Sequence, residues 1–220
     1  MGGDALGKLT DIAGDLCYLA LAIVALWGAF MVIITWRRVA QVRFRNERDQ
    51  NAFLAQLHEN LEAGDLEAAA ALCADDTRAV PQLVGLALAQ RHLGLNKLRH
   101  LVADRFQRDV LADLEYRVTW VQTVIKSAPM LGLLGTVVGM IGAFSKLASA
   151  NQVEPAKLAN DISVALITTF DGLVIAIPLI VAVAAINVRI RKMEDLVGLG
   201  LTQFFDVYKE AVEREPQLAR

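Results

Sequence analysis

Four polar side chains interrupt the most apolar stretches of this sequence. Thr136 lies within LGLLGTVVGMIG, and Thr168, Thr169 and Asp171 lie within ITTFDGLVIAIP. An aspartate at the centre of a membrane-spanning helix costs about 2.5 to 3.5 kcal/mol on insertion scales, so such residues usually face a bundle interior or water and often mark ion paths. We therefore take Asp171 and the three threonines as candidates for a proton or ion path.

Two other roles for Asp171 stay open. The carboxyl group can be neutral and hydrogen-bonded to Thr168 or to a neighbouring helix, or it can pair with a basic residue of another chain. Asp171 also lies about 200° from Thr169 on a helical projection. These two side chains therefore do not both point straight into one pore.

Small residues form a strip beside each group of polar side chains. In the earlier stretch the glycines fall within about an 80° arc of one helix face: Gly132, Gly135, Gly139 and Gly142. In the later stretch the strip consists of Ala165, Thr169, Gly172 and Ala176. Small residues let membrane helices approach closely, so the glycines predict a packing seam that needs no function beyond assembly.

The hydroxyl groups favour more than packing. An isolated membrane threonine usually bonds to a carbonyl of its own helix. Thr136 lies at the edge of one strip and Thr169 lies on the other, and this pairing favours a partly hydrated seam or pore. Pro129 and Pro178 each remove a backbone donor inside an apolar stretch and predict helix kinks.

Composition indicates a membrane protein. Of the 220 residues, 55% are hydrophobic and 21% are charged, and the mean hydropathy is +0.41. A helix needs roughly 20 apolar residues to cross a bilayer. We predict three spans, at residues 16–36, 121–147 and 162–188. The first is too long for a cleaved signal peptide, so we expect it to remain as an anchor.

Positive charge sets the predicted orientation, because cytoplasmic flanks carry the excess of Lys and Arg. Arginines follow the first span at once, and Arg189, Arg191 and Lys192 follow the third. Residues 37–120 and 189–220 are then inside, and residues 1–15 and the loop 148–161 are outside.

Helical patterns fill the predicted cytoplasmic parts. Gly64 and Asp65 are placed to end one helix and begin the next. The periodicity from about Leu98 has no Gly or Pro before the second span, so we expect one long helix there, and another helix at 189–220. The predicted fold is an all-α membrane protein with three transmembrane helices and a helical cytoplasmic region.

The sequence has no motif for covalent catalysis, a cofactor, a metal or nucleic acid. His58, His92 and His100 lack the spacing of metal ligands and are best explained as solvated or core positions. Cys17 and Cys73 lack a disulfide framework and are predicted to be buried as small hydrophobic residues. We predict that the protein is not an enzyme.

Two motifs resemble a known family. PMLGLLGTVVGMIGAF (129–144) followed by ALITTFDGLVIAIP (165–178) resembles the paired signature of the MotA/TolQ/ExbB proton-channel family. The resemblance covers about residues 121–190, and three spans place the chain nearest the ExbB/TolQ branch. Thr136 and Thr169 match the pore-lining threonines of that family.

The resemblance implies a multi-pass protein of the bacterial inner membrane, with a periplasmic N-terminus and a cytoplasmic C-terminus. It implies a homo-oligomer, a pentamer, whose second and third spans surround the helix of an ExbD- or TolR-type partner that carries an aspartate. Proton flow would then drive work, either ExbB-like energising of TonB-dependent outer-membrane transport or TolQ-like envelope maintenance through TolA. A passive oligomeric scaffold in the bilayer is the remaining alternative.

The sequence departs from the family pattern at two positions. ExbB and TolQ proteins carry a glutamate near the start of the third span, where this sequence has Val164. Asp171 takes a position that is usually apolar. The two positions share a helix face about 10.5 Å apart along the axis. We interpret Asp171 as the family's carboxylate moved two turns deeper.

Overall fold

The computed structural model describes residues 2–149 and 155–218, and every element within them is helical. In chain order these are α1 (Gly2–Val42), α2 (Glu47–Glu62), α3 (Leu66–Ala74), α4 (Ala79–Ala89), α5 (Leu95–Arg105), the π-helical turn η1 (Phe106–Leu111), α6 (Ala112–Ser149) and α7 (Pro155–Leu218). The described residues contain no strand, and three helices are long and apolar enough to cross a membrane. The predicted fold class is confirmed. Part of the predicted loop, residues 150–154, lies outside the described ranges.

The helices run longer than the predicted spans. Helices α5, η1 and α6 follow one another without a gap from Leu95 to Ser149, which confirms the predicted long helix. The π-helical turn within it was not predicted, because its sequence FQRDVL contains no Gly or Pro to mark it. The third span and the predicted C-terminal helix are likewise one element, α7, of 64 residues.

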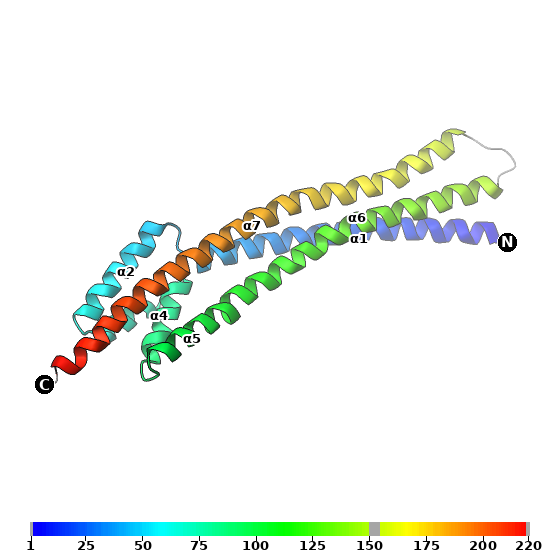
Figure 1. Cartoon of the computed structure of the whole chain (residues 1–220). Coiled ribbons are helices and arrows are strands. Elements are labelled where there is room, and N and C mark those ends of the chain that lie inside the picture. Colours follow the sequence, from blue (N-terminus) through cyan, green and yellow to red (C-terminus); the bar gives the residue numbers. More distant parts are fainter. Residues whose placement is uncertain (1, 150–154, 219–220) are drawn as a thin grey trace. The chain divides into compact units, whose positions relative to one another are not determined.

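The chain divides into two compact units. The first unit comprises Met1–Ile34 and Arg117–Ala185. In it α1, α6 and α7 lie side by side (Figure 1). All three helices meet at Gly28, where an added Cβ would lie 2.8 Å from Val124 Cγ1 and 2.9 Å from Leu179 Cδ1.

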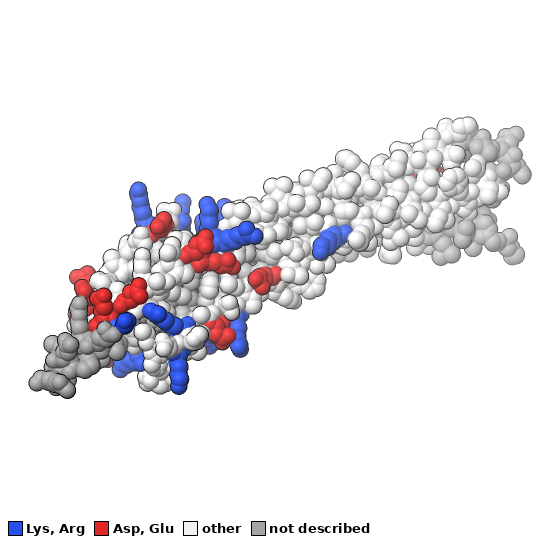
Figure 2. Space-filling model, viewed as in Figure 1, with Lys and Arg blue, Asp and Glu red and all other residues white. Residues whose placement is uncertain are grey.

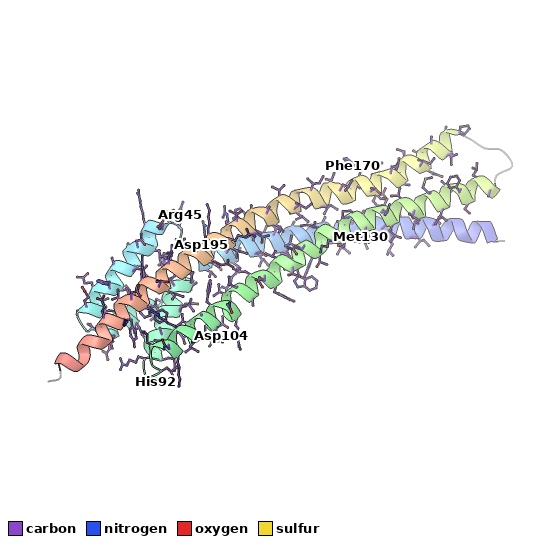
Figure 3. The ribbon with its side chains drawn as sticks, in the orientation of Figure 1. Arg45, His92, Asp104, Met130, Phe170 and Asp195 are labelled. Atoms are coloured by element: carbon purple, nitrogen blue, oxygen red, sulfur yellow. The ribbon has the colours of Figure 1, made fainter. Side chains whose placement is uncertain are left out.

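The outer surface of the first unit is apolar. Met130 on α6 is 70% exposed and Phe170 on α7 is 64% exposed, and both are labelled in Figure 3. On the face shown in Figure 2, charged side chains gather over the second unit and are few on the first. An exposed apolar surface of this extent is typical of a protein that meets lipid or other subunits.

The second unit comprises Thr35–Tyr116 and Ile186–Arg220. Its core is formed by aliphatic and aromatic side chains of α2, α4, α5 and the C-terminal part of α7, among them Leu57, Val84, Val102 and Phe204. Gln50 is buried within it, and its Nε2 donates to the Leu196 carbonyl at 2.6 Å. Gly200 leaves room for this amide, since an added Cβ would lie 2.7 Å from the same nitrogen.

Local turn chemistry in the second unit follows the sequence. Gly64 has φ of 74°, in the left-handed region that favours glycine, and directly precedes the N-cap of α3. That N-cap is Asp65, whose carboxylate accepts a hydrogen bond from the Ala68 amide at 2.9 Å. The predicted helix boundary at Gly64 and Asp65 is confirmed.

Two arginines of this unit lie over aromatic rings. The guanidinium of Arg189 lies 3.6 Å from the centre of the Trp36 ring, and that of Arg78 lies 3.9 Å from the centre of the Phe44 ring. Cation–π contacts of this kind bury the side of a guanidinium without removing its charge from water. The Arg189 contact lies at the end of the apolar part of α7.

Candidate functional site between helices α6 and α7

The glycines of α6 allow α7 to pack so closely that the backbones of the two helices come into contact. A Cβ added at Gly132 would lie 2.6 Å from the Thr168 carbonyl oxygen, and one at Gly135 would lie 2.7 Å from Thr168 Oγ1. A Cβ added at Gly139 would lie 2.7 Å from the Cβ of Ala165. No side chain larger than hydrogen fits at these positions without separating the helices.

The approach is reciprocal at the other end of the seam. A Cβ added at Gly172 of α7 would lie 2.6 Å from the Ala128 carbonyl oxygen and 3.2 Å from the Cα of Pro129. Gly142 differs from the other glycines of α6, because it faces Thr10 of α1, whose Oγ1 would lie 3.0 Å from an added Cβ. The strip that the sequence assigned to a single face therefore serves two neighbouring helices.

Thr168 lies at the centre of the seam. Its side chain is 2% exposed, and its Oγ1 lies 3.0 Å from the Gly132 carbonyl oxygen and 2.7 Å from the Ala165 carbonyl oxygen. The hydroxyl thus joins α6 to α7 and also bonds within its own helix. Within one chain, the contacts of Thr168 are those of a packing residue.

Thr136 and Thr169 lie at the edge of the same seam, where both are half-buried. Their hydroxyl groups contact each other, and Thr136 Oγ1 donates to the Gly132 carbonyl at 3.0 Å. Because Thr136 has one hydroxyl proton, this arrangement makes Thr169 the donor to Thr136. The lone pairs of Thr169 Oγ1 are then available to an external donor such as water.

A shallow apolar groove of about 780 Å³ runs along α6 next to this threonine pair. Its lining is apolar except for two hydroxyl groups, and it consists of Leu133, Thr136, Val137, Met140, Ile141, Phe144, Ser145 and Ala148. The sequence of α6 has no titratable residue between Lys126 and Lys146. Apart from Ser145, the threonine pair is therefore the polar point on an apolar face.

Asp171 lies on the other edge of the packed face of α7, toward α1. Val164 is two turns earlier on the same face, and its carbonyl accepts a hydrogen bond from Tyr18 Oη of α1 at 3.1 Å. The half-buried Asp171 carboxylate is within electrostatic range of the same tyrosine. Asp171 and Thr169 thus face different neighbouring helices.

The Asp171 carboxylate makes no hydrogen bond or ion pair with any residue in the described ranges. The Thr168 hydroxyl bonds to carbonyl oxygens instead, so the alternative in which Asp171 is bonded to Thr168 is not observed. Tyr18 was not predicted as a site residue, because a tyrosine in an apolar run is typical of lipid-facing and interfacial positions. The signal that could have identified Tyr18 was its hydroxyl group, which lies within an otherwise apolar membrane span.

The remaining predicted positions are placed as follows. Pro129 lies inside α6 and Pro178 inside α7, and each helix continues past its proline. His58 pairs with Glu62 at 3.4 Å on α2. Within the described residues, no group of three or more His, Cys, Asp or Glu side chains is placed to hold a metal ion.

Comparison with known proteins identifies the family. The sequence model of the MotA/TolQ/ExbB proton channel family matches residues 84–197, which is just over half of the chain. The chain belongs to this family. The match includes α6 and the part of α7 with Thr136, Thr168, Thr169 and Asp171, whereas Tyr18 lies outside it.

Individual relatives carry the names of both branches. The chain is 34% identical over 107 residues to the Tol-Pal system protein TolQ of Haemophilus influenzae, covering 48% of this chain and 47% of the relative. It is 40% identical over 84 residues to the putative biopolymer transport protein ExbB-like 2 of Helicobacter pylori, covering 38% and 54%. The chain thus spans about half the length of these relatives, and their similarity supports the ExbB/TolQ branch without separating its two members.

Proposed function

We propose that this chain is the proton-channel subunit of a motor complex in the bacterial inner membrane. Its proton path runs along the edge of the seam between α6 and α7. The observation that carries this proposal is the contact between the hydroxyl groups of Thr136 and Thr169 across the two helices. Family membership supports it, since the family is one of proton channels.

The chemistry of the threonine pair suits the passage of protons. A chain of hydroxyl groups and water can pass a proton by exchanging hydrogen bonds, and it needs no fixed charge. Thr136 donates to its own helix and accepts from Thr169, so the pair is ordered and has one free acceptor side. Each elementary charge that crosses 100 mV releases about 2.3 kcal/mol, and several protons per step supply the energy for a large rearrangement.

We propose that the pore is enclosed by an oligomer of this chain. Exposed apolar faces of α6 and α7 meet neighbouring copies in a pentamer, and the threonine edges face its centre. A single-span partner of the ExbD/TolR type occupies that centre and brings the aspartate that carries the proton. The N-terminus is periplasmic and the C-terminus cytoplasmic, in line with the arginines that follow the first and third spans.

We propose that the motor performs the ExbB-like task, which is to energise TonB-dependent outer-membrane transport. The similarity to the TolQ protein of Haemophilus influenzae makes envelope maintenance through a TolA-type protein the second candidate. Deletion of the gene separates these two tasks. Loss of energised uptake with an intact envelope supports the first task, and leakage of the envelope with normal uptake supports the second.

The proposal is tested by proton flux. The complex is isolated through a tag on this chain and placed in liposomes, and an electrical potential drives proton uptake. Uptake above that of empty liposomes, and its loss when the partner is removed, is the expected result. A complex that carries no protons with its partner bound would contradict the proposal.

A passive scaffold is the competing function, and the glycine contacts of α6 favour it as far as packing is concerned. A scaffold uses Thr168 and the glycines but has no need of the hydroxyl groups at the seam edge. Variants at Thr136 and Thr169 that assemble normally therefore separate the two functions. Full proton-driven work in those variants would support the scaffold.

A further inference from the structure

A second polar position lies inside the first unit, away from the threonine pair. Asp171 is half-buried in α7, and α1 packs along the same side of that helix. Tyr18 of α1 donates to the Val164 carbonyl at 3.1 Å, and its hydroxyl is within electrostatic range of the Asp171 carboxylate. This places a carboxylate and a phenol hydroxyl together on the α1 side of α7.

Few other titratable groups face Asp171. On α7 it is the only such group between Asp161 and Arg189, and α6 has none between Lys126 and Lys146. On α1 the titratable residues between Asp15 and Arg37 are Cys17, which is buried, and Tyr18. No described basic side chain is bonded to the carboxylate. An unpaired charge is costly inside a bilayer, and the described residues offer the Asp171 carboxylate no partner of opposite charge.

The N-terminal end of α1 leads to this position. Asp15 is exposed and lies three residues before Tyr18, on the same side of α1. From that end of α1, the polar groups follow in the order Asp15 carboxylate, Tyr18 hydroxyl and Asp171 carboxylate. All three groups can accept or donate a hydrogen bond to water.

We propose that Asp171 is a proton-binding site within the membrane, reached along the side of α1 past the Tyr18 hydroxyl and separate from the Thr136–Thr169 contact. In this step the Asp171 carboxylate accepts a proton from a hydronium ion, one O–H bond forms, and one O–H bond of the hydronium ion breaks to leave water. Release reverses the step. Its part in proton flow rests on the proposed channel function, but the binding of the proton does not.

The test uses the complex in native membrane vesicles and the apolar reagent dicyclohexylcarbodiimide. This reagent reacts with protonated carboxylic acids in apolar surroundings, and mass spectrometry of the α7 peptide reads out the adduct. We expect labelling of Asp171 in acidic buffer and a fall in labelling as the pH is raised, because the reagent adds only to the protonated carboxyl group. Asp171→Asn should abolish the adduct, and Asp171→Glu should keep it.

Matched variants locate the site. Asp161→Asn removes a half-buried carboxylate of α7 that pairs with Lys146 of α6 at 3.5 Å, and it should leave the labelling of Asp171 unchanged. Thr136→Val should also leave it unchanged, whereas Tyr18→Phe should change its rate several-fold. The proposal would be overturned if Asp171 formed no adduct at any pH or if the yield of adduct did not depend on pH. It would also be overturned if Tyr18→Phe were labelled at the wild-type rate, or if Thr136→Val lost the labelling.

Proton uptake in the same vesicles separates this site from the channel function. If the wild-type complex takes up no protons while Asp171 is labelled as expected, the channel proposal fails and the proton site stands. If the complex takes up protons and Asp171 is unlabelled, the site fails and the channel stands. Where both hold, Asp171→Asn should lower uptake several-fold.

Discussion

The hydroxyl of Thr168 lies 3.0 Å from the carbonyl oxygen of Gly132, on the neighbouring helix. The same carbonyl accepts a hydrogen bond from Thr136, also at 3.0 Å. One backbone oxygen therefore serves both the packed centre of the seam and the threonine pair at its edge. A change that moves Gly132 is expected to disturb packing and the candidate proton path together.

The first prediction concerns Gly132→Ala. The added Cβ would lie 2.6 Å from the Thr168 carbonyl oxygen, and the backbone there cannot rotate away. We expect a loss of about 1 to 3 kcal/mol of stability, the usual cost of overpacking a tight contact. The midpoint of denaturant-induced unfolding of the complex in detergent measures this loss.

Gly14→Ala on α1 is the matched control, because an added Cβ there meets nothing within 4 Å. It should be neutral or slightly stabilising, as alanine is the better helix former. Equal effects of the two substitutions would show that the close contact at Gly132 does not hold the helices together.

The second prediction concerns the pH dependence of the second unit. Side-chain hydrogen bonds from the Arg78 guanidinium hold the pKa of the Asp76 carboxyl below its usual value. A lowered pKa in the folded state stabilises the fold above the unfolded pKa of about 3.9, and this stabilisation is lost as the pH falls through the folded pKa. The partial exposure of both side chains limits the effect to below about 1 kcal/mol.

Hydrogen exchange of the α4 amides in wild type and Asp76→Asn measures this contribution. We expect faster exchange in the variant at neutral pH. The two proteins should converge as the pH falls from about 4 through the lower folded pKa of Asp76. A difference that persists unchanged into acid would mean that the hydrogen bonds from Arg78 do not depend on the charge of Asp76.

The third prediction concerns Cys73. Burial raises the pKa of its thiol to about 11, and the nearby Asp76 carboxylate adds to this rise. Against an ordinary thiol pKa of about 8.5, the thiolate fraction at neutral pH falls by roughly two orders of magnitude. With Cys17 replaced by Ala, alkylation of Cys73 by a maleimide should be at least that much slower than alkylation of an exposed thiol.

Ala70→Cys in a chain lacking both native cysteines supplies the comparison, since Ala70 is an exposed position on the same helix. Unfolding in denaturant should bring the two alkylation rates together. Equal rates in the folded protein would show that Cys73 is accessible and that its thiol is not shielded by α3 and α4.

Some of this arrangement could be predicted from the sequence. Apolar runs predicted three membrane helices, and the absence of Gly and Pro after Leu98 predicted the long helix that begins at Leu95. Gly64 and Asp65 predicted a helix boundary, because their backbone and capping preferences are local. Features of this kind depend on residues close together in the chain.

Other features depend on the rotation and neighbours of each helix. Thr168 and Thr169 differ by about 100° on a helical projection, and only the packing of α7 shows which of them is buried. Gly142 shares a face with the other glycines but packs on α1, and Tyr18 meets α7 through a residue 146 positions away. A pattern read along one helix cannot identify such partners.

The hydroxyl groups of Thr136 and Thr169 are the central feature of the proposed proton path, and the fourth prediction removes them. Valine keeps the shape of threonine without the hydroxyl, whereas serine keeps the hydroxyl. We expect Thr136→Val with Thr169→Val to lower proton uptake at least about tenfold, since tenfold corresponds to about 1.4 kcal/mol, the scale of one to two hydrogen bonds. The paired serine variants should retain most of the uptake.

Thr123→Val controls for the loss of a hydroxyl on α6, because Thr123 Oγ1 donates only to the Thr119 carbonyl of its own helix at 2.9 Å. The most direct measurement is therefore potential-driven proton uptake by liposomes containing the assembled complex, compared among these variants. Uptake lost with valine, kept with serine and unchanged in Thr123→Val is the predicted result. Full uptake in a normally assembled double valine variant would contradict a proton path along the Thr136–Thr169 edge.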